Sequence, residues 1–187
     1  MNCRGYGGIY TSPCHQARKK NIPYKNYIIN CIVENNQSTN DRDAAYGHGM
    51  YLTAWDNDNI LVRGNVCRNN KGSGIHLEDG VKHIYIEGNE CYNNGQYGIW
   101  IIGANYCIIR NNKIHHNSRG IHSVDSNYNL IYDNEIYDNE IEGVYLGSWG
   151  TPSHSKDKLQ LPGTYNAILC NTVKNNNQTY IDAGSGI

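Results

Sequence analysis

The stretch that decides the fold is GIHLEDGVKHIYIEGNECYNNGQYGIWI, residues 74–101. A Gly-Ile pair opens it at Gly74 and returns 24 residues later at Gly98, with an Asn-rich segment between them. Polar and apolar residues alternate within each apolar piece, which is the pattern of a short strand with one buried face. No piece has the spacing of an amphipathic helix. The stretch therefore indicates one repeat unit made of short strands and tight turns.

The same unit recurs along the chain, marked by an asparagine with an apolar residue two positions later. Its successive spacings are 35, 24, 23, 22 and 37 residues, at Asn30, Asn65, Asn89, Asn112, Asn134 and Asn171. A repeat of 22–24 residues explains the middle of the chain, and we expect the two long steps to contain insertions, at about 35–48 and 147–163. The apolar residues expected to point inward after the asparagine include Ile32, Cys67 and Cys91.

A unit of this size cannot bury its own apolar face, but it can do so when stacked on copies of itself. We expect each unit to supply three short parallel strands to a coil, with equivalent residues about 4.8 Å apart in columns. Stacked asparagines can then hydrogen-bond to one another through their side-chain amides. The sequence thus predicts an all-β parallel β-helix with an asparagine ladder. It would be a single domain over residues 1–187, and the opening MNCRGYGGIYTSPC suggests a fragment of a longer coil.

Residues 59–77 and 83–101, NILVRGNVCRNNKGSGIHL and HIYIEGNECYNNGQYGIWI, resemble the repeats of right-handed parallel β-helix proteins in the pectate-lyase-like superfamily. The resemblance covers about residues 5–187 and implies a right-handed single-stranded solenoid. It also implies that the Gly-Ile strand forms the floor of a polysaccharide groove, and that the protein is extracellular or at the cell surface. Leucine-rich repeats are an alternative with a similar period. In those repeats a helix or an extended arc would replace YNNGQYGIWI.

The residue after each Gly-Ile pair should lie in one outward column. Its members are all aromatic or histidine: Tyr10, Tyr51, His76, Trp100, His122 and Tyr145. We expect this column to be exposed to water and to bind sugars, because flat rings pack against sugar C–H faces. From the insertions we add Trp149 and Arg42 to the predicted substrate-binding residues. The alternative is that these rings are good strand formers that stack on one another.

Two enzymatic reactions fit the titratable residues near this column. Elimination or C5 epimerisation of a uronic-acid polymer needs a base, an acid and a group that neutralises the carboxylate. Candidate groups are His76 or His122 as base, Tyr51 as acid, and Arg42 or His48 as the neutralising group. A Ca²⁺ ion is another candidate, because carboxylate oxygens cluster at Asp56, Asp58, Glu78 and Asp79. Glycoside hydrolysis would instead pair Glu78 with Asp56 or Asp125.

A non-catalytic glycan-binding or structural β-helix is the third possibility. The net charge of −1 argues against a nucleic-acid partner. No apolar run approaches the roughly 18 residues of a membrane span, and no signal peptide is visible at the start of the chain. Uncapped coil ends would favour self-association. The seven cysteines lack Cys-x-x-Cys spacing, so we interpret most of them as small core residues.

Overall fold

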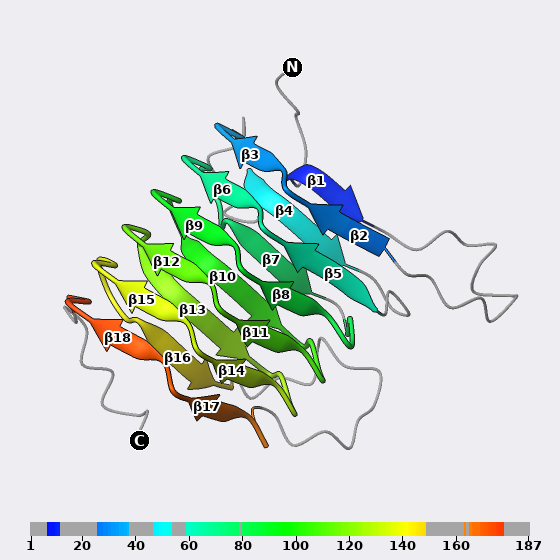
Figure 1. Ribbon diagram of the computed structural model, residues 1–187, viewed down its shortest axis with the longest axis vertical. Helices are drawn as coiled ribbons and strands as arrows, with labels where there is room; N and C mark the ends of the chain where they lie inside the picture. The colour runs from blue at the N-terminus through cyan, green and yellow to red at the C-terminus, as the bar shows by residue number, and fades with distance from the viewer. Residues whose placement is uncertain are drawn as a thin grey trace, which may run out of the picture.

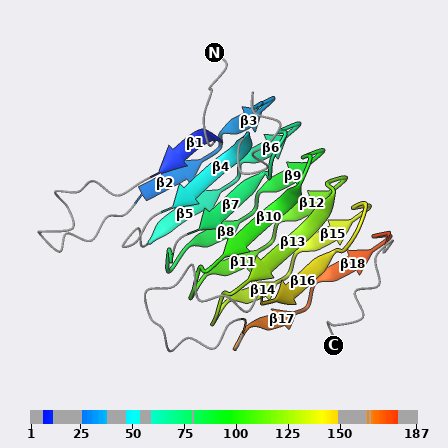
Figure 2. The ribbon, with the colours of Figure 1, turned by 180° about the vertical axis from the view of Figure 1, so that it is seen from behind.

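The chain winds into a coil with three strands in each turn. The computed structural model describes residues 7–11, 26–37, 47–53, 59–78, 80–148, 163 and 165–177. Every strand pairs in parallel with the equivalent strand of the next turn, which produces three six-stranded sheets (Figure 1). The view from behind shows the same turns stacked along one axis (Figure 2). The predicted all-β parallel β-helix is therefore confirmed.

We number the sheets in the order in which the chain visits them. The first sheet contains β1 (Gly7–Thr11), β4 (His48–Thr53), β7 (Ile75–Glu78), β10 (Tyr97–Ile102), β13 (Arg119–Val124) and β16 (Val144–Gly147). The second sheet contains β2 (Asn26–Ile29), β5 (Ile60–Arg63), β8 (Tyr85–Glu87), β11 (Ile108–Arg110), β14 (Leu130–Tyr132) and β17 (Ala167–Leu169). The third sheet contains β3 (Ile32–Glu34), β6 (Val66–Arg68), β9 (Glu90–Tyr92), β12 (Lys113–His115), β15 (Glu135–Tyr137) and β18 (Thr172–Lys174).

The core lies inside the coil and is built from the alternate residues of these strands. Ile75, Leu77 and Ile86 are completely buried in one continuous apolar cluster. Each such side chain contributes about 1.5–3 kcal/mol by leaving water. Cys67 and Cys91 pair in register and are both buried and free, as the column pattern predicts. Among the described residues no helix could cross a membrane.

The asparagine ladder runs along the turn between the second and third sheets. At each step the backbone and side-chain N–H groups of one asparagine donate hydrogen bonds to the side-chain oxygen of the equivalent asparagine in the next turn. Asn89 illustrates this, since its backbone N–H and Nδ2 lie 2.9 and 3.0 Å from Oδ1 of Asn112. Asn89 Nδ2 also donates to the carbonyl of Val62 at 2.9 Å. The ladder satisfies backbone groups that would otherwise be buried without partners, and it is confirmed from Asn65 to Asn171.

The prediction that Asn30 begins this ladder is wrong by one residue. Cys31 occupies the ladder position and donates its backbone N–H to Asn65 Oδ1 at 2.9 Å. Asn30 instead adopts a left-handed turn conformation, with φ 54°. The same shift makes Ile32 an outward residue, 67 % exposed, and places Val33 in the core. A strand has a period of two, so a shift of one residue exchanges its faces.

A second ladder follows the turn between the third and first sheets. It runs from Asn36 through Asn70, Asn94, Asn117 and Asn139 to Asn176. The signal for it is the second residue of pairs such as Asn69-Asn70 and Asn93-Asn94, whose first residue has a positive φ. The leucine-rich alternative is excluded, because the segment after Asn89 forms β9 and β10.

Candidate functional site

The predicted aromatic column exists on the outer side of the first sheet. Strand register aligns its six members in order, from Tyr10 through Tyr51, His76, Trp100 and His122 to Tyr145. None of them belongs to the apolar core cluster. The His76 and Trp100 rings stack with centroids 4.2 Å apart, and those of His122 and Tyr145 are 4.4 Å apart. The six members come from six strands, and Tyr97 bridges the rings of Trp100 and His122, with centroids 4.8 and 4.7 Å away.

The expectation that this whole column is exposed to water is wrong. Tyr10 is 50 % exposed, but Tyr51, His76 and His122 are exposed by only 8, 2 and 8 %. A second outward column packs beside the first and helps to bury it. This column consists of the residue before each glycine of the Gly-Ile motif: His48, Ser73, Tyr97, Arg119 and Glu142. Its rings lie close to those of the first column. The ring centres of His48 and His76 are 4.5 Å apart, and those of Tyr97 and His122 are 4.7 Å apart.

A hydrogen-bond chain fixes the protons of His48 and His76. The backbone N–H of Ser73 donates to His48 Nδ1 at 2.8 Å, so a neutral His48 carries its proton on Nε2. That Nε2 lies 3.1 Å from His76 Nδ1 and therefore donates to it. Burial, and to a lesser degree the proximity of His48, lowers the pKa of His76 well below its ordinary value of 6.5. His76 is thus neutral at pH 7, with its proton on Nε2.

Glu78 and Tyr51 complete this first cluster. The Tyr51 hydroxyl donates to a Glu78 carboxylate oxygen. The same oxygen, Oε2, is 3.9 Å from His76 Nε2, which is too far for a hydrogen bond. His76 Nε2 and Trp100 Nε1 are both buried and have no hydrogen-bond partner among the described residues. The first cluster therefore holds one hydrogen-bonded acid and two unused N–H donors.

Several predicted site residues lie outside the described part of the chain. These are Arg42, Asp56, Asp58, Asp79 and Trp149. Of the four predicted Ca²⁺ ligands, the structure describes only Glu78. The described residues contain no group of three or more His, Cys, Asp or Glu side chains suited to a metal ion. The Ca²⁺ site and the loop contributions therefore stay predictions.

A second cluster surrounds His122, further along the column. His122 Nδ1 is 3.0 Å from Glu142 Oε1, and Arg119 Nε is 3.1 Å from Glu142 Oε2. Burial tends to raise the pKa of Glu142, but the His122 hydrogen bond and the Arg119 charge outweigh it, so the pKa is lowered. An ionised carboxylate only accepts hydrogen bonds, so His122 carries a proton on Nδ1. A neutral His122 then has its free lone pair on Nε2.

Tyr97 adjoins the second cluster. Arg119 Nη1 donates to its hydroxyl at 3.4 Å, and the guanidinium lies 5.5 Å from the Tyr97 ring centre. Burial raises the pKa of Tyr97, so the phenol keeps its proton at neutral pH. Sequence reasoning missed Tyr97, Arg119, Glu142 and Ser73, although each directly precedes a motif glycine. The position directly before the glycine of the Gly-Ile motif could therefore have identified these residues from the sequence.

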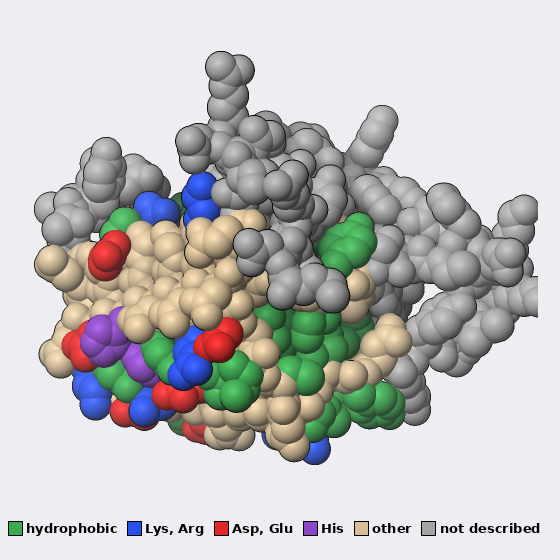
Figure 3. Space-filling view, turned by 90° about the horizontal axis from the view of Figure 1, so that it is seen from above, with side chains coloured by type: hydrophobic (Ala, Val, Ile, Leu, Met, Phe, Trp, Pro, Cys, Tyr) green, Lys and Arg blue, Asp and Glu red, His purple; other side chains and the backbone are tan. Residues whose placement is uncertain are grey.

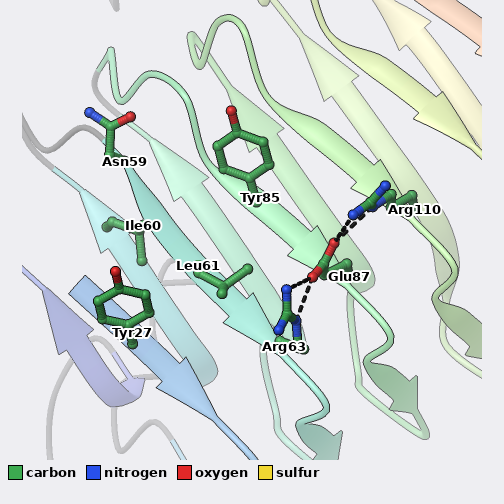
Figure 4. Close-up of a pocket in the computed structure, with 8 residues that line it drawn as sticks. All are labelled: Tyr27, Asn59, Ile60, Leu61, Arg63, Tyr85, Glu87 and Arg110. Atoms are coloured by element: carbon green, nitrogen blue, oxygen red, sulfur yellow. Dashed lines mark hydrogen bonds and ion pairs between the residues drawn. The ribbon is translucent and has the colours of Figure 1, made fainter. Parts of the chain in front are cut away.

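A shallow pocket of about 350 Å³ lies apart from the column, on the outer side of the second sheet (Figure 4). Glu87 bonds Arg63 and Arg110 across its floor, and the Arg110 hydrogen bond is the main reason that the pKa of Glu87 is lowered. Tyr27 and Tyr85 line it and are 63 and 40 % exposed. On the face seen in Figure 3, acidic and basic side chains are interspersed. The described residues that line this pocket include no histidine, and their one carboxylate, Glu87, is held in two ion pairs.

Comparison with known proteins supports the fold assignment. No curated protein sequence matches the chain. Among solved structures, the A-module of the mannuronan C-5 epimerase AlgE6 from Azotobacter vinelandii is similar, with a TM-score of 0.56 and 19 % sequence identity. The match covers 84 % of this chain and 52 % of that module, so the chain spans about half of its length. The family model described as "Right handed beta helix region" matches residues 54–187. The chain therefore belongs to the right-handed β-helix family.

Proposed function

We propose that the protein binds an acidic polysaccharide along the column of the first sheet and removes the C5 proton of a uronate residue. The observation that carries the proposal is the His122–Glu142 pair, a buried histidine oriented by a carboxylate within a column of rings. The similarity to a mannuronan epimerase module supports the choice of a uronic-acid polymer as substrate class.

His122 is better suited than His76 to be the base. Glu142 holds the Nδ1 proton of His122 and would stabilise the imidazolium that forms when Nε2 accepts the C5 proton. In His76 the Nε2 atom already carries a proton, and Nδ1 is occupied by His48. His76 therefore has no free lone pair with which to remove a proton.

Tyr97 is the proton donor that best matches His122. Its ring centre is 4.7 Å from that of His122, and the Arg119 hydrogen bond would stabilise the phenolate left after proton transfer. Tyr51 is three coil steps from His122, or roughly 14 Å, so the two cannot act on one carbon.

The placement of both groups favours elimination over epimerisation. His122 and Tyr97 lie on neighbouring strands of one sheet with ring centres 4.7 Å apart, so a sugar bound over the column would meet both on the same face. In elimination, His122 takes the C5 proton, the bond from C4 to its oxygen breaks, and Tyr97 protonates the departing oxygen. Epimerisation would require a proton to be delivered to the opposite face of C5.

The test is an incubation of the protein with uronic-acid polymers in D₂O, with added Ca²⁺ or with a chelator. Elimination yields unsaturated ends that absorb in the ultraviolet, and epimerisation places deuterium at C5. We expect His122→Gln to reduce turnover at least about 100-fold, whereas Tyr51→Phe retains it. The proposal is wrong if neither product forms from any uronate polymer. Loss of turnover with the chelator would support the predicted Ca²⁺ site.

A non-catalytic glycan-binding module is the second candidate. It is favoured by the burial of His76 and His122, whose rings pack as a structural stack would. For this function we expect uronate chains to bind without product formation. Trp100→Ala should weaken that binding, because Trp100 contributes a ring to the middle of the column.

A further inference from the structure

Two N–H donors on the outer side of the first sheet lack acceptors. They are His76 Nε2 and Trp100 Nε1, on rings stacked 4.2 Å apart in neighbouring strands. A buried donor without a partner costs about 1–3 kcal/mol, and native structures rarely contain one without a reason. A bound ligand that supplies acceptor oxygens would remove this cost.

Both atoms are committed to donating. An indole nitrogen has no acceptor capacity. The imidazole of His76 is committed by its neighbours, since Ser73 N–H occupies His48 Nδ1 at 2.8 Å and His48 Nε2 then donates to His76 Nδ1 at 3.1 Å. His48 is completely buried, so it acts on a ligand only through His76. The fold therefore presents His76 Nε2 as a donor.

Glu78 restricts which kind of ligand oxygen can bind beside His76. Its Oε2 atom is 3.9 Å from His76 Nε2, too far for a direct bond but within the span of a bridging atom. A hydroxyl oxygen can accept from His76 and donate its own proton to Glu78. A carboxylate would place a second negative charge beside Glu78, which is unfavourable.

We propose that His76, Trp100 and Glu78 form a subsite that recognises a hydroxyl group of a sugar, and that His48 is the positioning residue that sets the proton on His76. The proposal rests on the proposed function in that the ligand is a glycan in the column. It deepens that function by assigning the first cluster to specificity and the second cluster to chemistry.

The experiment is an NMR titration of the ¹⁵N-labelled protein with a mannuronate trisaccharide, with its carboxyl-reduced counterpart and with acetate. We expect His76 to show the Nε2–H tautomer before any ligand is added. Both sugars should shift the His76 Nε2 and Trp100 Nε1 signals, and acetate should not. Shifts with acetate and the uronate alone would overturn the hydroxyl assignment in favour of a carboxylate site.

Deoxy analogues of whichever trisaccharide binds test the recognition itself. Removal of the recognised hydroxyl should lower affinity at least about 100-fold, because the buried donors lose their acceptor. Equal affinities for all monodeoxy analogues would overturn the proposal, as would binding that leaves both nitrogen signals unmoved. If neither sugar binds, the inference is also wrong.

A pair of variants at His48 and a single variant at Trp100 separate positioning from simple packing. His48→Gln can still accept from Ser73 and donate to His76, so we expect it to keep the tautomer and an affinity within about threefold of wild type. His48→Leu should give mixed tautomers and about tenfold weaker binding. Trp100→Phe keeps a ring but loses the N–H, and it should also bind about tenfold more weakly. This variant keeps the proposal testable if His48→Leu does not fold, and unchanged binding in it would contradict the subsite.

These outcomes are distinct from those of the proposed function. Turnover in D₂O without any shift of the His76 Nε2 or Trp100 Nε1 signals would support the proposed chemistry and overturn the proposed subsite. Shifts with the carboxyl-reduced sugar and no turnover of any uronate would do the reverse.

Discussion

Glu142 Oε1 lies 3.0 Å from His122 Nδ1, and this contact joins two neighbouring turns of the coil. The lowered pKa of Glu142 keeps the carboxylate ionised at neutral pH, so the bond places the histidine proton on Nδ1. The contact between His48 and His76 has the opposite effect, because it places the proton of His76 on Nε2. Two histidines of one column thereby carry their protons on different ring nitrogens.

The His122–Glu142 pair is tested by Glu142→Gln. An amide can stabilise either tautomer of His122 and cannot balance the charge of the imidazolium, so we expect kcat to fall by roughly 10²–10⁴-fold. The matched control is Glu140→Gln, which changes an exposed acid two residues away and should leave kcat unchanged. Equal rates in wild type and Glu142→Gln would remove His122 from the mechanism.

The register of the asparagine ladder predicts a contrast in stability. Asn89→Ala removes the acceptor of the backbone and side-chain N–H groups of Asn65 and the donor to the Val62 carbonyl, so we expect a loss of about 3 kcal/mol in the free energy of unfolding. Asn30→Gly should change it by under about 0.5 kcal/mol, because glycine tolerates the positive φ there. Urea unfolding measures both, and a large loss in Asn30→Gly would restore Asn30 to the ladder.

The ion pairs of Glu87 with Arg63 and Arg110 lead us to expect a loss of stability in acid. Its pKa is lowered from 4.5, chiefly by the Arg110 hydrogen bond, with Arg63 as a further cause. The folded state therefore binds a proton less readily than the unfolded chain. This contribution is present above pH 4.5 and disappears as the pH falls through the lower folded value.

We expect Glu87→Gln to flatten this part of the pH–stability curve, as measured by thermal unfolding at several pH values. The effect should be smaller than that of Asn89→Ala, because Arg63 and Arg110 are 54 and 40 % exposed and solvent screens the pair. Added salt should reduce it further. If the loss of stability at low pH were the same in Glu87→Gln as in wild type, other carboxylates would be responsible for it.

The cysteines differ in burial, so we expect alkylation to be selective among them. Cys91 is buried beside Cys67, and the hydrogen bond between the thiols, together with burial, raises the pKa of Cys91 well above 9.0. The reactive thiolate is therefore scarce and shielded. Iodoacetamide should label the exposed Cys170 in the native protein, and Cys67 and Cys91 only after unfolding. Peptide mass spectrometry measures this, and rapid native labelling of Cys91 would contradict the packing of the third sheet.

The repeat itself was readable from the chain. Gly-Ile recurring with an Asn between, at 22–24 residues, is enough to predict parallel coils, because each unit must stack on another to bury its apolar face. The same pattern correctly aligned Tyr51, His76 and Trp100. The alignment failed at Asn30, where an insertion separates two coils and an asparagine stands beside the true ladder position.

The sequence by itself therefore determined the coil, its inward columns and the outward column of rings, since all of these follow from a period that local residue spacing displays. Only the tertiary structure decided which rings are buried, that Ser73 and His48 orient His76, and that Glu142 orients His122. Those relationships depend on side chains from different columns meeting across coils. A repeat defines which residues lie above one another, but the distances and directions that set proton positions arise only when the coils are packed together.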